Sequence, residues 1–141
     1  MLISLTLALS TQALSPPPPA VNEFPASKVV QVTSNALTCT PSGSFSVDLR
    51  WRYRKGVVSA TVKRQGEILP LAENKKLVAA LHQATDLLYV QTGCSGSHDA
   101  MIKIVFVGIK NGQPSVMALV AFVRFHTLEM TSPVEMPLSR Y

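Results

Sequence analysis

Cysteine, charge and aromatic residues are all scarce in this sequence. Only two of the 141 residues are cysteine, 15% are charged and 6% are aromatic. Two cysteines are too few for a disulfide-dense miniprotein or a four-ligand zinc module. A chain of this length also has no room for a Rossmann domain or a TIM barrel. The low charge, combined with 47% hydrophobic residues, excludes a disordered chain and leaves one small globular domain.

The first twenty residues have the composition of an export signal. Residues 2–9 form a short apolar run, small residues follow at Thr11 and Ala13, and residues 16–19 are all proline. The run is too short to span a bilayer, which takes about 20 apolar residues. No lysine or arginine precedes it, so a buried N-terminal strand is the alternative, although the prolines disfavour a strand. We expect a signal peptide and Pro-rich spacer over residues 1–20, and a periplasmic or extracellular protein.

Export gives the two cysteines a structural role. Cys39 and Cys94 lie far apart in the sequence, and neither belongs to a C-x-x-C motif. In an oxidising compartment we expect them to form one structural disulfide. Two unrelated buried thiols are the alternative.

The clearest hydrophobic pattern is an alternation over residues 44–54. Apolar side chains at every second position alternate with serine, aspartate and arginine, which is typical of a strand with one buried face. Residues 55–56 then indicate a turn, and the alternation resumes over residues 58–62 to complete a hairpin. A second turn at residues 65–66 leads into a short strand that ends before Pro70.

The period changes over residues 73–84. Apolar residues recur there at spacings of three and four, namely Leu77, Ala80, Leu81 and Ala84. This spacing predicts the buried face of an amphipathic helix. Glu73 lies in the first turn, where the helix dipole favours a carboxylate.

Three further strands are expected after this helix. Residues 87–92 form the first, and residues 102–109 and 116–125 flank Asn111-Gly112, the strongest short signal for a hairpin. The last two runs are apolar on both faces, so we expect them in the centre of a sheet. Neither run is long enough to cross a membrane.

The order of these elements predicts an α+β fold. Because the connections between strands are short, we expect a twisted antiparallel sheet of about six to seven strands in hairpins, with the amphipathic helix packed on one face. The single domain would cover residues 21–130. Residues 131–141, with two prolines and a polar end, would form a loosely ordered tail.

The loop at residues 93–99 begins like a nucleophile elbow. The elbow needs glycine at its fifth position and a following helix, whereas this loop has Ser97 there and leads into a strand. Catalytic triads also converge from distant segments, so neighbouring His98 and Asp99 do not easily align behind Ser95. We expect a polar loop that contacts a partner through Ser95, Ser97, His98 and Asp99. The alternative is a small exported hydrolase that uses Ser95 or Cys94 with His98 or His126 as base.

Other catalytic and metal-binding patterns are missing from the sequence. The three histidines show no metal-ligand spacing, and the eight acidic residues offer no evident catalytic pair. We therefore expect no metal site, no cofactor and no enzymatic activity.

The most unusual feature is a basic hairpin, in which no acidic residue occurs from residue 49 to residue 64. Trp51 and Tyr53 alternate with its arginines, so we expect both aromatic rings in the core, where they cannot stack on nucleic-acid bases. A row of cations remains on the other face, formed by Arg50, Arg52, Arg54 and Lys63. Such a row fits an acidic protein, a glycan or a lipid surface rather than nucleic acid. A solvated face without a ligand is the alternative.

These features predict an exported, non-catalytic binding domain that contacts an anionic partner through its arginine-rich strand face. The small β-rich scaffold, the single pair of cysteines and the Ser/Gly-containing loop are similar to those of the periplasmic inhibitors of lysozyme. This similarity rests on size and composition, and it assigns a role to no individual residue. It implies a further alternative, inhibition of an envelope enzyme.

Overall fold

The structure is a computed structural model that describes residues 28–96 and 99–137. The expected signal peptide and spacer lie outside the described residues, as do Ser97 and His98 of the loop. Within the described ranges the chain forms nine strands and one helix. Their bounds are β1 (Val30–Cys39), β2 (Gly43–Arg52), β3 (Gly56–Arg64), β4 (Glu67–Ile68), α3 (Leu71–Ala80), β5 (Ala84–Cys94), β6 (Ala100–Lys110), β7 (Gln113–Arg124), β8 (Thr127–Met130) and β9 (Val134–Glu135).

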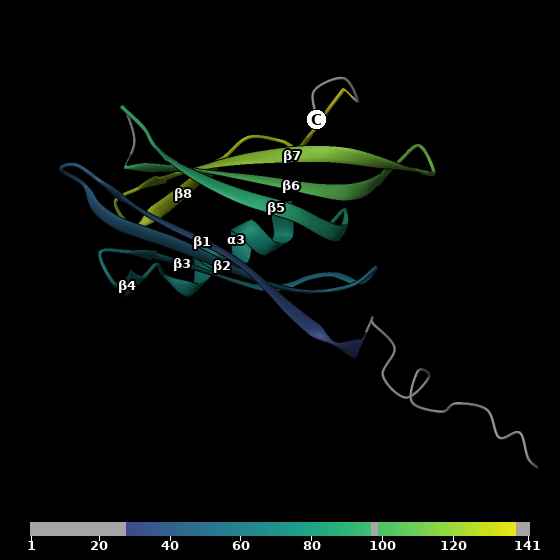
Figure 1. Ribbon diagram of the computed structural model, residues 1–141, viewed down its shortest axis with the longest axis horizontal. Coiled ribbons are helices and arrows are strands. Elements are labelled where there is room, and N and C mark those ends of the chain that lie inside the picture. Colours follow the sequence, from purple (N-terminus) through teal and green to yellow (C-terminus); the bar gives the residue numbers. More distant parts are fainter. Residues whose placement is uncertain (1–27, 97–98, 138–141) are drawn as a thin grey trace, which may run out of the picture.

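The strands form two antiparallel sheets that lie one above the other (Figure 1). Sheet A has the order β1-β2-β3-β4, and sheet B has the order β5-β6-β7-β8, with β9 also paired to β7. The expectation of strands with one helix is confirmed, but that of a single sheet of six to seven strands is wrong. The chain changes sheets at the helix, since every strand before α3 belongs to sheet A and every later described strand to sheet B. Alternation along a strand shows which face is buried, and it does not show which sheet the strand joins.

The hydrophobic core lies between the two sheets. Inward side chains of β2 pack with those of β6 and β7, and α3 contributes Leu77 and Leu81. As expected, β6 and β7 are internal strands of their sheet. The largest fully buried side chains of β2, β6 and β7 are Leu49, Ile102, Ile104, Phe106 and Leu119.

Two hairpin turns follow directly from their sequences. Asn111-Gly112 joins β6 to β7, and Gln65-Gly66 joins β3 to β4, with positive φ at all four residues (52° and 77°, then 54° and 83°). Two consecutive residues with positive φ are the requirement of the type I′ turn, whose twist matches that of the strands. The turns expected at both places are confirmed.

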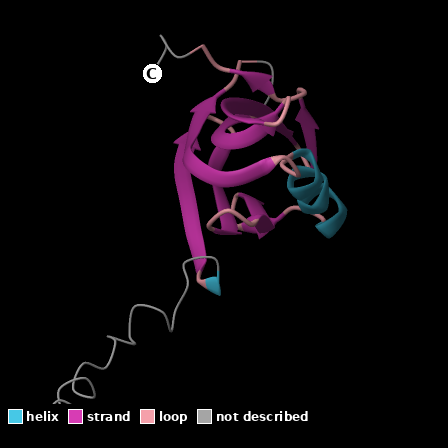
Figure 2. Ribbon diagram, turned by 90° about the vertical axis from the view of Figure 1, so that its right-hand side faces the viewer, coloured by secondary structure: helices cyan, strands magenta, loops and turns pink. Residues whose placement is uncertain are grey.

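Helix α3 closes one side of the sandwich, at the edge seen on the right of Figure 2. Its Asn74 is buried and bonds to the edge of sheet A. The Oδ1 atom of Asn74 accepts a hydrogen bond from the Val62 N–H of β3 at 3.0 Å, and its Nδ2 donates to the Leu69 carbonyl at 3.3 Å. The helix ends at Ala80 rather than at the expected residue 84.

The same helix also bonds to the edge of sheet B. Glu73 Oε1 accepts a hydrogen bond from the Leu128 N–H of β8 at 2.9 Å, and Lys76 Nζ donates to the Leu128 carbonyl at 3.2 Å. Side chains of α3 thus take the place of a neighbouring strand at both sheet edges. We call the contact of α3 with β3 and β8 the helix junction.

Within the described residues, no helix is long and apolar enough to cross a membrane.

Strands β1 and β5 close the opposite side, and we call their contact the strand junction. Asn35 Nδ2 donates to the Val90 carbonyl at 3.0 Å, and Thr92 Oγ1 donates to Asn35 Oδ1 at 2.6 Å. Cys39 and Cys94, the last residues of the two strands, form a disulfide with their Cα atoms 5.5 Å apart. The expected disulfide is confirmed.

Three strands have no counterpart among the expected elements. β1 is polar on much of both faces, so its apolar alternation is weak. β8 has only four residues, and it follows the two-residue turn Phe125-His126. β9 lies within the segment expected as a tail, where its two residues pair with Met117 and Ala118 of β7.

Candidate functional site

The outer face of sheet A carries the cations that the sequence singles out. Residues that lie opposite one another on neighbouring strands point to the same side of a sheet. An outward residue of β2 therefore has outward neighbours on β1 and β3. Arg50 of β2 is opposite Val32 of β1 and Ser59 of β3. Ser46 is in the same way opposite Lys63. The face is therefore continuous from Arg52 at one end of β2 to Ser44 at the other.

Arg50 and Arg52 project from this face, and neither has an acidic partner among the described residues. Across the described part of the chain, the recorded salt bridges use Arg64, Lys76, Lys110 and Arg124, and none uses these two arginines. Their neighbours on β1 are exposed valines, and Val32 retains 55% of its accessible surface. One acid, Asp48, follows on the same strand face. Two unpaired guanidinium groups beside apolar side chains form an amphiphilic, cationic surface.

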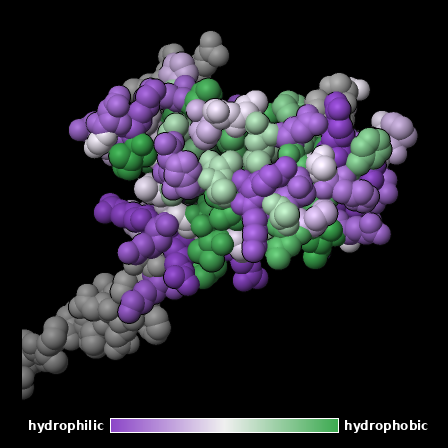
Figure 3. All heavy atoms as spheres, turned by 180° about the vertical axis from the view of Figure 1, so that it is seen from behind, coloured by the Kyte–Doolittle hydropathy of each residue, from purple (hydrophilic) through white to green (hydrophobic). Residues whose placement is uncertain are grey.

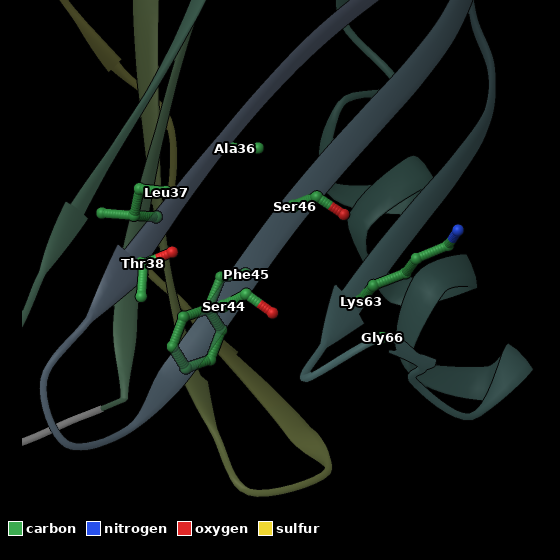
Figure 4. Close-up of a pocket in the computed structure, with 8 residues that line it drawn as sticks. All are labelled: Ala36, Leu37, Thr38, Ser44, Phe45, Ser46, Lys63 and Gly66. Atoms are coloured by element: carbon green, nitrogen blue, oxygen red, sulfur yellow. The ribbon is translucent and has the colours of Figure 1, made fainter.

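A shallow hollow of about 340 Å³ lies at the other end of the face (Figure 4). Its outer-face residues are small, so the strands themselves form its floor. Ser44, Ser46 and Lys63 point to the same side of the sheet in Figure 4, whereas Leu37 points to the other. With Thr38, which is opposite Ser44, the hollow offers three hydroxyl groups and one ammonium group. These groups donate hydrogen bonds to anions.

Arg54 does not continue the row of Arg50 and Arg52. β2 ends at Arg52, and Arg54 lies in the following turn with a φ of 60°. Its N–H donates to Asp86 Oδ1 at 2.9 Å, and its guanidinium lies 5.2 Å from the centre of the Tyr53 ring. Tyr53 is accordingly 39% exposed, so the expectation that it belongs to the core is wrong, although Trp51 is buried as expected.

The loop after β5 shows no assembled nucleophile among its described residues. Cys94 cannot supply a thiolate because its sulfur is in the disulfide. The carboxylate of Asp99 accepts hydrogen bonds from Arg64 Nε and from the Phe125 N–H, both at 2.8 Å. Asp99 therefore connects β3 of sheet A to the β7–β8 turn of sheet B, and its described contacts include no histidine. Ser97 and His98 lie outside the described residues.

Of the described histidines, His82 lies far from Ser95, whereas His126 lies in a turn that the 93–99 loop contacts through Asp99. His82 precedes β5 and Ser95 follows it, so the two are separated by the length of an eleven-residue strand, about 35 Å. His126 lies in the β7–β8 turn. Among the described residues, no three metal-ligating side chains of histidine, cysteine or acid gather at one place.

Sequence reasoning missed two features near the basic hairpin. Arg64 forms the pair with Asp99, and its guanidinium lies 5.8 Å from the Phe125 ring centre, so it links the sheets rather than extending the cationic face. The period of two contained this signal, because it places Arg64 on the same face as buried Val62. The second feature is an apolar groove of about 330 Å³ between β3 and α3. Its walls come from two distant segments, and no local pattern shows that they meet.

Comparison with known proteins gives no relative from which a function could be transferred. No protein-family model, curated protein or solved structure matches this chain.

Proposed function

We propose that the chain is a non-catalytic binding domain that holds an anionic partner on the outer face of sheet A. The observation that carries this proposal is the outward projection of Arg50 and Arg52, without an acidic partner among the described residues. The planar guanidinium group of arginine binds carboxylate and phosphate groups in two-point contacts.

The composition of the face supports an acidic partner with apolar groups. Lys63 and the serine hydroxyls of the hollow add donors at one end, and the exposed valines beside Arg50 and Arg52 add apolar surface at the other. An acidic protein surface combines both properties, and an envelope enzyme with such a surface would make the domain an inhibitor. An acidic glycan or a lipid surface would satisfy the cations as well.

We also propose that the domain works after export. The disulfide between Cys39 and Cys94 is compatible with an oxidising compartment. The apolar run at residues 2–9 supports the same location. N-terminal sequencing of the protein from the periplasm or medium tests this proposal. A mature start near residue 14 or residue 21 is expected, and an intact Met1 would contradict it.

Retention on heparin-agarose at low salt tests the binding face directly. The double variant Arg50→Glu/Arg52→Glu should lose retention, because it reverses both unpaired charges. The matched control is Lys103→Glu/Lys110→Glu, which changes the net charge equally on sheet B. The control should elute at a salt concentration close to that of the wild type. Equal losses in both variants would show that net charge alone is responsible, and would overturn the proposed face.

A further inference from the structure

The edge of β3 is open over half of its length. β4 pairs only with Lys63 and Arg64, and β3 has no other strand partner on that side within the described residues. The next outward backbone groups, those of Val62, bond to Asn74 Oδ1 and to the Leu69 N–H. Because outward groups alternate along a strand, Ala60 is the next residue whose N–H and carbonyl point away from β2. Gly56 is buried against the Ala84 carbonyl of β5, so the open stretch runs from Val57 to Thr61.

An apolar groove follows this open edge. It has a volume of about 330 Å³, and its lining residues are Val58, Ser59, Ala60, Leu71, Asn74, Lys75, Val78 and Ala79. Two of its apolar side chains are unusually accessible, since Val58 is 51% exposed and Leu71 is 68% exposed. Figure 3 faces the side of the molecule that carries α3, and hydrophobic surface is visible there between hydrophilic residues. The groove thus combines free backbone hydrogen-bonding groups with an apolar wall.

The charges around the groove select its occupant. Lys75 lies on the helix side of the groove, and on the neighbouring strand Arg50 is opposite Ser59, while the one acid, Asp48, is opposite Thr61. A second copy of the chain would place the same cations against each other, at a cost in free energy. A segment that carries acidic residues between its apolar ones would pair with these cations instead.

We propose that the groove binds an extended segment of a partner protein in which acidic and apolar side chains alternate. The segment adds to the edge of β3 as a further strand, with backbone hydrogen bonds to Ala60. Its apolar side chains contact Leu71 and Val78, and the carboxylates on its other face point to the side of the sheet that carries Arg50. This inference rests on the proposed function, and it specifies the anionic partner as an acidic protein segment.

A soluble peptide of alternating valine and glutamate is the probe for this site. In ¹⁵N NMR spectra of the full domain, its addition should shift the amide signals of residues 57–61 and 71–79. Hydrogen exchange at the Ala60 amide should slow, because that N–H gains an acceptor. Shifts confined to Arg50 and Arg52 would overturn the inference and leave the proposed function intact. The absence of any shift at the β3 edge would also overturn it.

A variant at the groove separates the two proposals. Leu71→Asp places a negative charge at the first position of α3, where the helix dipole tolerates it, so the domain should still fold. Peptide affinity should fall about tenfold, while the salt concentration that elutes the domain from heparin should stay unchanged. The control Leu88→Asp replaces an apolar side chain of β5 that is 48% exposed and should bind the peptide normally. Equal affinities for both variants would contradict a site in the groove.

Discussion

The two junctions between the sheets are closed by different means. At the strand junction, a disulfide and the side chain of Asn35 hold β1 against β5. At the helix junction, α3 inserts Leu77 and Leu81 into the core, while Asn74, Glu73 and Lys76 bond to the backbone of both sheet edges. The first junction depends on a covalent bond between the ends of two strands, and the second depends on burial and on paired polar groups.

This difference explains where the molecule has a free edge. A helix can satisfy the backbone of an edge strand only where its side chains reach, which for β3 is Val62. The rest of the β3 edge stays open beside the groove. Natural sheets usually protect such edges with charge, and the cations around β3 fit that pattern. The helix junction therefore provides both the closure of the core and the surface that we assign to a partner.

The largest effect is expected from the disulfide of the strand junction. Replacing both Cys39 and Cys94 with alanine should lower the free energy of unfolding by about 4 kcal/mol, because the bond closes a long loop in the unfolded chain. That loss is a large part of the roughly 5–15 kcal/mol that stabilises a typical domain. Urea unfolding of the oxidised wild type and the double variant measures it. A loss below about 1 kcal/mol would show that side-chain contacts alone hold β1 to β5.

Replacing one asparagine in each junction compares how much a single side chain contributes to the free energy of unfolding. Asn74→Ala should cost about 2 kcal/mol, because it leaves the buried N–H of Val62 and the carbonyl of Leu69 without partners. Asn35→Ala should cost about 1 kcal/mol or less, since water can reach the partly buried Val90 carbonyl. Urea midpoints at constant m-value give both numbers. An equal or larger loss for Asn35→Ala would reverse the comparison.

Local sequence chemistry was sufficient for much of the fold. The alternation over residues 44–54, the helical spacing around Leu77 and the turn at Asn111-Gly112 each depend on neighbouring residues. The structure contains all three, although the strand ends at Arg52. The disulfide could be expected because two cysteines, if the chain meets an oxidising compartment, have one economical arrangement.

The division into two sheets depends on contacts that no local pattern contains. β1 alternates between Val30, Val32 and polar residues, and its β-branched side chains were the available signal, but its exposed faces weaken the contrast on which prediction depends. The buried role of Asn74 could not be expected either. A lone asparagine in a helix is usually solvated, and only the position of β3 gives its amide two backbone partners.

Only part of the candidate site could be predicted, because local sequence patterns do not contain tertiary contacts. The period of two places Arg50 and Arg52 on one outward face, and the structure shows both there. The place of Arg54 depends on where β2 ends, and strand ends are set by the turn conformation rather than by the period. The groove at the β3 edge needs α3 beside β3, which is a tertiary contact.

The smallest expected effect is a pH dependence that belongs to the helix junction. The hydrogen bond from Lys76 lowers the pKa of Glu73 below its ordinary value of 4.5, and the Leu128 N–H lowers that pKa further. A carboxyl group with a lowered pKa in the folded state stabilises the fold above its unfolded pKa, and this contribution is lost as the pH falls through the folded pKa. Acidification below about pH 4.5 should therefore weaken the contact of α3 with β8.

Glu73→Gln isolates this contribution, because glutamine keeps an acceptor for Leu128 but cannot titrate. The difference in urea midpoint between wild type and variant should be present at about pH 6 and should shrink as the pH falls toward about 3. Glu135 is the control carboxylate, because its pKa is also lowered, first by the hydrogen bond from Ser115 and then by Lys110. Its pair with Lys110 is exposed, so added salt should weaken the part of the Glu135 pH dependence that comes from Lys110, while the part that comes from the Ser115 hydrogen bond should remain. A Glu73→Gln difference that stays constant with pH would show that the carboxylate charge does not hold the helix to sheet B.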